Sequence, residues 1–133
     1  MAKSKKKIVR EFYESDFFND TSNLDKYMHP EMELYWNAKT GYNHMDIQAV
    51  KDMATEAGKS FDAVRPQITH LLSDGDNVVI RFTYHVTTIE TPEVEEPIAH
   101  FMAIWELKDG LMYRGYQMTQ PIEEDKKAMK SWK

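Results

Sequence analysis

The stretch VVIRFTYHVTT, residues 78–88, alternates between polar and apolar side chains along its length. Successive side chains of a β-strand point to opposite faces of a sheet, so the pattern predicts a strand with two different surfaces. If the apolar surface covers the core, the polar side chains are solvated. If both surfaces are buried, an arginine and a histidine are held inside the molecule. The two sets are Arg81, Thr83, His85 and Thr87, and Ile80, Phe82, Tyr84 and Val86.

The rest of the chain supplies helices first and strands afterwards. Helical spacing of apolar residues predicts a helix over 6–20, a short helix over 22–30 that Pro30 ends, and an amphipathic helix over 45–58. Strands are expected over 31–37, 61–72, 78–88, 98–107 and 111–120, with a loop over 38–44. This order predicts an α+β fold with three N-terminal helices on a curved mixed or antiparallel sheet. The last three strands should form a meander. We expect one domain over 1–133, with 1–6 and 122–133 as polar tails.

Composition narrows the function classes. The net charge of −5 argues against nucleic acid as a partner, because phosphate binding needs a concentrated basic surface. The chain has no cysteine, which excludes disulfides and thiolate chemistry. No apolar run approaches the roughly 20 residues of a membrane span, so no membrane partner is expected. The basic start is not followed by a signal-type apolar segment, which favours a cytoplasmic location.

Both faces of the expected sheet carry large apolar side chains. We expect one face to combine Arg81, Thr83 and His85 with Ala99, Phe101, Gly115 and Gln117. The opposite face is rich in methionine and aromatic residues and has no spare helix to cover it, which predicts a homodimer through that face. Its expected residues are Ile80, Phe82, Tyr84, Met102, Ile104, Met112, Tyr116 and Met118.

Four segments in this order resemble those of a known superfamily: LDKYMHPEMEL at 24–34, DGDNVVIRFTYH at 74–85, PIAHF at 97–101 and KDGLMYRGYQM at 108–118. The layout resembles the cone-shaped fold of the nuclear transport factor 2-like (NTF2-like) superfamily. That superfamily includes SnoaL-type polyketide cyclases, ketosteroid isomerases and limonene epoxide hydrolases. The resemblance implies a pocket between the helices and the concave sheet face, with a dimer often formed through the opposite face. It also implies that Arg81, Thr83 and His85 point into the cone.

Where the related enzymes have catalytic carboxylates, this chain has other residue types. Compared with the isomerases, Tyr13 matches their tyrosine, but Trp36 and Ala99 stand where the base and the oxyanion-binding acid would be. Compared with the epoxide hydrolases, Arg81 matches their arginine, but Thr83 and Gln117 replace the two acids. The cyclases usually place an acid on the last strand, where this chain has Gln117 and Gln120. Each of those routes therefore lacks its acid or base.

The remaining titratable candidates are His85 and Tyr13. Burial and the like charge of Arg81 should lower the pKa of His85, which would let it act as a base. Its alternative role, with Arg81, is to bind acidic side chains at the cone mouth, and Tyr13 could simply be core. The resemblance implies that the ligand is bound by Trp36, Arg81, Thr83, Phe101 and Gln117.

These residues fit a small, largely apolar ligand with one polar end. Three functions stay open: a cofactor-free isomerase, cyclase or lyase, a binding protein without turnover, and a protein-interaction dimer. No cofactor and no metal is expected, because the five histidines show no ligand spacing.

Overall fold

The structure is a computed structural model that describes residues 4–123 and 126–133. Its sheet has six strands in the order β2-β1-β6-β5-β4-β3. Neighbouring strands are antiparallel except β1 and β6, which are parallel. The elements are α1 (Lys5–Glu14), α2 (Ser22–Tyr27), β1 (Met28–Ala38), β2 (Gly41–Asp46), α3 (Ile47–Gly58), β3 (Phe61–Asp74), β4 (Asn77–Thr88), β5 (Glu95–Lys108), β6 (Leu111–Pro121) and the 3-10 helix η1 (Lys126–Trp132).

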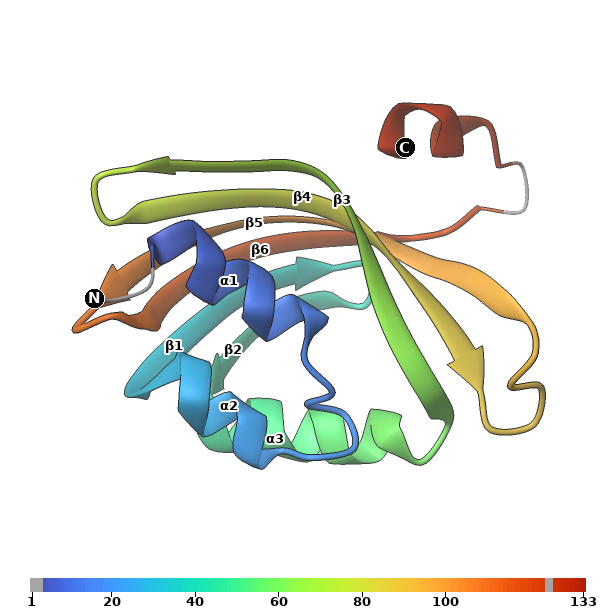
Figure 1. Ribbon diagram of the computed structural model, residues 1–133, viewed down its shortest axis with the longest axis horizontal. Coiled ribbons are helices and arrows are strands. Elements are labelled where there is room, and N and C mark those ends of the chain that lie inside the picture. The colour runs from blue at the N-terminus through green and yellow to red at the C-terminus, as the bar shows by residue number, and fades with distance from the viewer. Residues whose placement is uncertain (1–3, 124–125) are drawn as a thin grey trace.

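All three α-helices lie on one side of the strongly curved sheet, and η1 lies on the other side (Figure 1). We call the side toward the α-helices the concave face and the opposite side the convex face. This arrangement confirms the expected α+β cone and the meander of the last three strands. None of the helices in the described part of the chain has the length and apolar character that a membrane crossing requires.

Helices α1 and α3 begin at polar caps and bury one apolar side each. The Ser4 hydroxyl accepts a hydrogen bond from the Lys7 backbone N–H at the start of α1, and the Asp46 carboxylate accepts one from Ala49 at the start of α3. Gly58, the last residue of α3, passes so close to the Phe18 carbonyl that an added Cβ would clash with its oxygen. A side chain at that position would push α3 off the preceding loop.

The segment 38–44, expected as a loop, contains the start of a strand instead. β2 pairs with β1 at the edge of the sheet, and all its residues but Met45 are exposed. A strand that buries almost nothing has no apolar alternation, so the sequence carries no periodic signal for it.

The two faces of β4 are reversed relative to the expectation. Phe82 is opposite Phe101 in the register with β5, and their rings stack 4.8 Å apart on the concave face. Ile80 and Tyr84 share that face and are buried in the core. Successive residues of a strand point to opposite faces, so Arg81, Thr83 and His85 project from the convex face. The expectation that they point into the cone is therefore wrong.

The expected dimer face also loses half of its members. Ile80, Phe82 and Tyr84 belong to the core, and so does Met112. Met112 changes face because a register shift between Glu106 and Leu107 places it opposite the buried Leu107. Of the eight expected residues, four remain exposed on the convex face: Met102, Ile104, Tyr116 and Met118, which we call the convex patch.

Candidate functional site

A cavity of about 190 Å³ lies between the α-helices and the concave face. Half-buried residues from β1, α3, β3 and β5 lie at its mouth, and buried core side chains line most of the rest. Its lining is almost entirely apolar. The lining residues are Phe12, Tyr13, Phe17, Phe18, Met28, Leu34, Trp36, Val50, Met53, Ala57, Phe61, Tyr84, Ile98, Phe101, Trp105 and Gln117.

Three polar groups form a hydrogen-bonded relay in this cavity. The Trp105 indole N–H donates to the Tyr13 hydroxyl oxygen at 2.8 Å. The Tyr13 hydroxyl in turn donates to Oε1 of Gln117 at 3.0 Å. The three residues come from β5, α1 and β6, so the relay forms only once the helix is packed on the sheet. We call it the Trp105–Tyr13–Gln117 relay.

The two cavity tyrosines are held in their neutral form. Burial raises the pKa of Tyr13 far above its usual range, outweighing the opposing hydrogen bond from Trp105. Burial also raises the pKa of Tyr84, helped by the nearby Tyr13, and the Tyr84 hydroxyl donates to the Tyr13 backbone carbonyl at 3.1 Å. Both hydroxyls are thus protonated at neutral pH and act as hydrogen-bonding groups rather than bases.

Trp36 lies at the mouth of the cavity. Its indole N–H donates to the Thr119 hydroxyl at 3.0 Å, and its ring lies 6.4 Å from that of Phe101. The neighbouring Tyr35 projects from the other face, where it stacks between His44 and Tyr116. The prediction that Trp36 rather than Tyr35 faces inward is confirmed.

The structure brings together four of the seven residues predicted for the site. Tyr13, Trp36, Phe101 and Gln117 all line the cavity. Trp105 was not predicted as a site residue, although it lies on the same face of β5 as Phe101. A buried indole N–H needs a hydrogen-bond acceptor, and this requirement is the one signal that could have linked Trp105 to Tyr13.

Arg81 holds the C-terminal segment of the chain instead of a ligand. Its guanidinium donates to the Ser131 carbonyl at 2.8 Å and to the Thr69 hydroxyl at 3.1 Å. Its Cζ lies 3.5 Å from the centre of the Trp132 ring, a cation–π contact. The arginine thus anchors η1 on the convex face.

Thr83 and His85 also make their contacts outside the cavity. The Thr83 hydroxyl pairs with Nδ1 of His100 at 2.8 Å, and Nε2 of His85 lies 3.0 Å from Oε1 of Gln67. The pKa of His85 is lowered, as expected, by burial and by a nearby arginine. That arginine is Arg65 on β3, however, and not Arg81.

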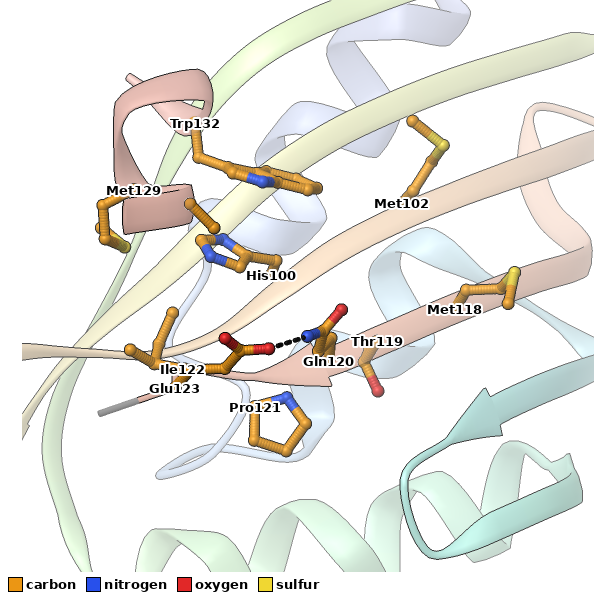
Figure 2. Close-up of a pocket in the computed structure, with 11 residues that line it drawn as sticks. His100, Met102, Met118, Thr119, Gln120, Pro121, Ile122, Glu123, Met129 and Trp132 are labelled. Carbon is orange, nitrogen blue, oxygen red and sulfur yellow. Dashed lines mark hydrogen bonds between the residues drawn. The ribbon is translucent and has the colours of Figure 1, made fainter. Parts of the chain in front are cut away.

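A second cavity, of about 260 Å³, lies on the convex face beneath η1. Figure 2 shows Trp132 and Met129 approaching from η1, with Met102 and Met118 projecting from β5 and β6. The Trp132 ring stacks on His100 with centroids 4.3 Å apart. This cavity continues into the convex patch, so the C-terminal segment covers only part of this face. Among the residues that the structure describes, no group of three His, Asp or Glu side chains is placed to hold a metal ion.

Comparison with known proteins places this architecture. The SnoaL-like domain matches residues 9–115. IdmH of Streptomyces antibioticus, a proposed polyketide cyclase, superposes with a TM-score of 0.70 at 13% identity over 88% of this chain and 92% of its own. A proposed polyketide cyclase from Acidithiobacillus ferrooxidans gives 0.65 at 19% identity over 87% and 88%. TerC, co-crystallised with polyporic acid, gives 0.62 at 18% identity over 97% and 98%.

These structural matches show a shared fold, since their identities are low. No curated protein sequence matches this chain. The domain match, in contrast, extends over most of the chain, from α1 to the middle of β6. The chain therefore belongs to the SnoaL-like family of the NTF2-like superfamily.

Proposed function

We propose that this protein binds one compact, largely apolar small molecule in the cavity on the concave face. The observation that carries the proposal is an apolar cavity with a single polar relay at its wall. Ligand sites commonly combine such a lining with a few placed polar groups. Because an apolar cavity of about 150 Å³ accommodates benzene, a cavity of about 190 Å³ suits one ring with a few substituents.

Binding without acid–base turnover is the function that the lining favours. The ionisable lining residues are Tyr13 and Tyr84, and both stay protonated at neutral pH. His85, the base first expected, projects from the convex face and pairs with Gln67. An isomerase or cyclase working here would depend on holding its substrate in a reactive conformation. The proposed cyclases and TerC support a small-molecule role through their shared fold.

Occupancy of the cavity can be tested by fluorine NMR with fluorobenzene as the probe. We expect saturable line broadening with the wild-type protein. Ala57→Phe should abolish it, because Ala57 lies at the cavity wall on α3 and a phenyl group would fill the space. Thr55→Phe, exposed on the same helix, should bind the probe as the wild type does. Equal binding by both variants, or none by the wild type, would remove the proposed function.

A second proposal concerns the convex patch, through which we infer that the chain forms a homodimer. Met102 is opposite Met118 and Ile104 is opposite Tyr116 on the adjacent strands β5 and β6, so the four side chains form one continuous surface. Contiguous exposed apolar surface on a folded domain commonly marks an interaction site. A two-fold axis through this patch would let each copy cover the other.

A further inference from the structure

We propose that the cavity selects ligands whose polar group is a neutral hydrogen-bond acceptor, such as a ketone or ester oxygen, and that Gln117 is the residue that recognises it. This inference rests on the proposed function, because it concerns the ligand of the same cavity. It follows from the direction in which the Trp105–Tyr13–Gln117 relay passes its hydrogen bonds.

The direction of the relay is fixed by chemistry at its first member. An indole N–H can only donate, so the Tyr13 oxygen must accept from Trp105. The Tyr13 proton is then left to donate, and the group 3.0 Å away is the side-chain amide of Gln117. The amide must present its oxygen to Tyr13. The reverse amide orientation would leave the buried Tyr13 proton without an acceptor among the described residues.

The consequence is that Gln117 faces the ligand as a donor. Its Oε1 is engaged by Tyr13, and its NH₂ group makes no hydrogen bond within the described residues. Gln117 itself lines the cavity. An amide NH₂ pairs with an acceptor oxygen and not with a group that can only donate, such as an ammonium.

Charged ligands fit this arrangement poorly. The described residues that line the cavity include no lysine, arginine or histidine. A carboxylate placed there would be buried with one neutral donor and no countercharge, which costs far more than burying a carbonyl. The polar end of the ligand is therefore expected to be uncharged.

Three probes of nearly the same shape separate these possibilities: acetophenone with its C=O, α-methylstyrene with C=CH₂ in its place, and benzoate with a negative charge. Each would be titrated against bound fluorobenzene. With the wild-type protein we expect acetophenone and α-methylstyrene to displace the reporter and benzoate to fail at neutral pH.

The decisive variant is Gln117→Met, which keeps the length of the side chain and removes its donors. It is made in a Tyr13→Phe background, as is its control, because the Tyr13 proton would otherwise lose its acceptor and donate to the ketone in place of the amide. Because the ketone is left without a hydrogen-bond donor, the affinity for acetophenone should fall by about tenfold relative to the affinity for α-methylstyrene. The matched control is Gln120→Met, which makes the same chemical change on the same strand but outside the cavity. It should leave the ratio of the two affinities unchanged. The carbonyl stretching frequency of bound acetophenone should rise in Gln117→Met and not in Gln120→Met.

The outcomes are distinguishable. If α-methylstyrene still binds Gln117→Met, the cavity has folded, and an unchanged affinity ratio then overturns the assignment of Gln117 while the proposed function stands. If benzoate displaces the reporter as well as acetophenone does, the neutral-acceptor class is wrong. If none of the probes displaces fluorobenzene, or fluorobenzene itself does not bind, both proposals fall.

Discussion

Tyr13 combines two duties that a phenylalanine could not perform. Its ring packs on Phe82 in the core with centroids 4.7 Å apart, and its hydroxyl links Trp105 to Gln117. The hydroxyl is the acceptor for the indole of Trp105, a residue that is only 1% exposed. A buried donor without a partner loses its hydration without compensation, so the relay contributes to stability as well as to the ligand recognition proposed above.

Tyr13→Phe should lower the free energy of unfolding by about 2 kcal/mol, because it leaves the Trp105 N–H without its acceptor. Urea denaturation followed by circular dichroism would measure the change. Tyr42→Phe removes a hydroxyl from an exposed tyrosine on β2 and should alter stability by less than about 0.5 kcal/mol. A similar small effect at both positions would show that the relay adds nothing to the folding free energy.

At the scale of elements, the alternation in β4 was readable from the sequence, but the face it presents to the core was not. The sequence shows that Phe82 and Thr83 point in opposite directions. Which of them joins Phe101 depends on the register between β4 and β5, and a slip of one residue exchanges the faces. The simple rule that the apolar side covers the core would have placed β4 correctly, whereas the family resemblance favoured the polar side.

The orientation of Phe101 and Gln117 toward the core, in contrast, was predictable from the sequence. Phe101 and Gln117 lie on strands whose core-facing parity is marked by small residues such as Ala103 and Gly115. An added Cβ at Gly115 would lie 2.5 Å from the Trp105 ring, so that ring is accommodated only by a glycine. The role of Arg81 was not predictable, because its partners Ser131 and Trp132 are some fifty residues away in sequence.

The convex side of β4 and β5 should make stability depend on pH. Burial lowers the pKa of His100, and the nearby Arg81 and His85 lower it further. In the unfolded chain, His100 binds a proton near its ordinary pKa of 6.5, whereas in the folded chain it binds one only at a lower pH. The stability contributed by neutral His100 is thus complete above that pH and is lost as the pH falls toward its lower folded value.

Thermal unfolding from pH 7.5 to about 5 should show this loss as a declining melting temperature. His100→Phe keeps a ring against Trp132 without a titrating group, and His100→Gln keeps a polar side chain. Both variants should show a shallower decline. The paired carboxylate of Glu95, whose pKa Arg65 lowers, contributes stability that is fully present above its ordinary value of 4.5 and is lost only below it, so its titration falls outside the window. A slope unchanged in both variants would assign the pH dependence to other groups.

At the scale of the whole molecule, the two faces of the sheet differ: one encloses a cavity and the other carries an exposed apolar patch. The concave face is closed by three helices and retains one apolar cavity. The convex face is covered in part by η1, which Arg81 anchors, and leaves the convex patch bare. The patch is bordered by the ion pair of Arg114 and Glu33, 3.1 Å apart. An apolar centre with a charged border is the usual anatomy of a protein interface.

Met118→Lys should therefore separate the proposed homodimer. A two-fold axis brings both copies of the substituted residue into one interface, so two unpaired ammonium groups would be buried together. We expect the dimer dissociation constant, measured by analytical ultracentrifugation, to rise by at least about tenfold. Ile89→Lys is the matched control, since Ile89 is 54% exposed and Met118 is 66% exposed but Ile89 lies in the loop between β4 and β5, outside the patch. Wild-type protein that sediments as a monomer, or a dimer weakened equally by both substitutions, would exclude this face as the interface.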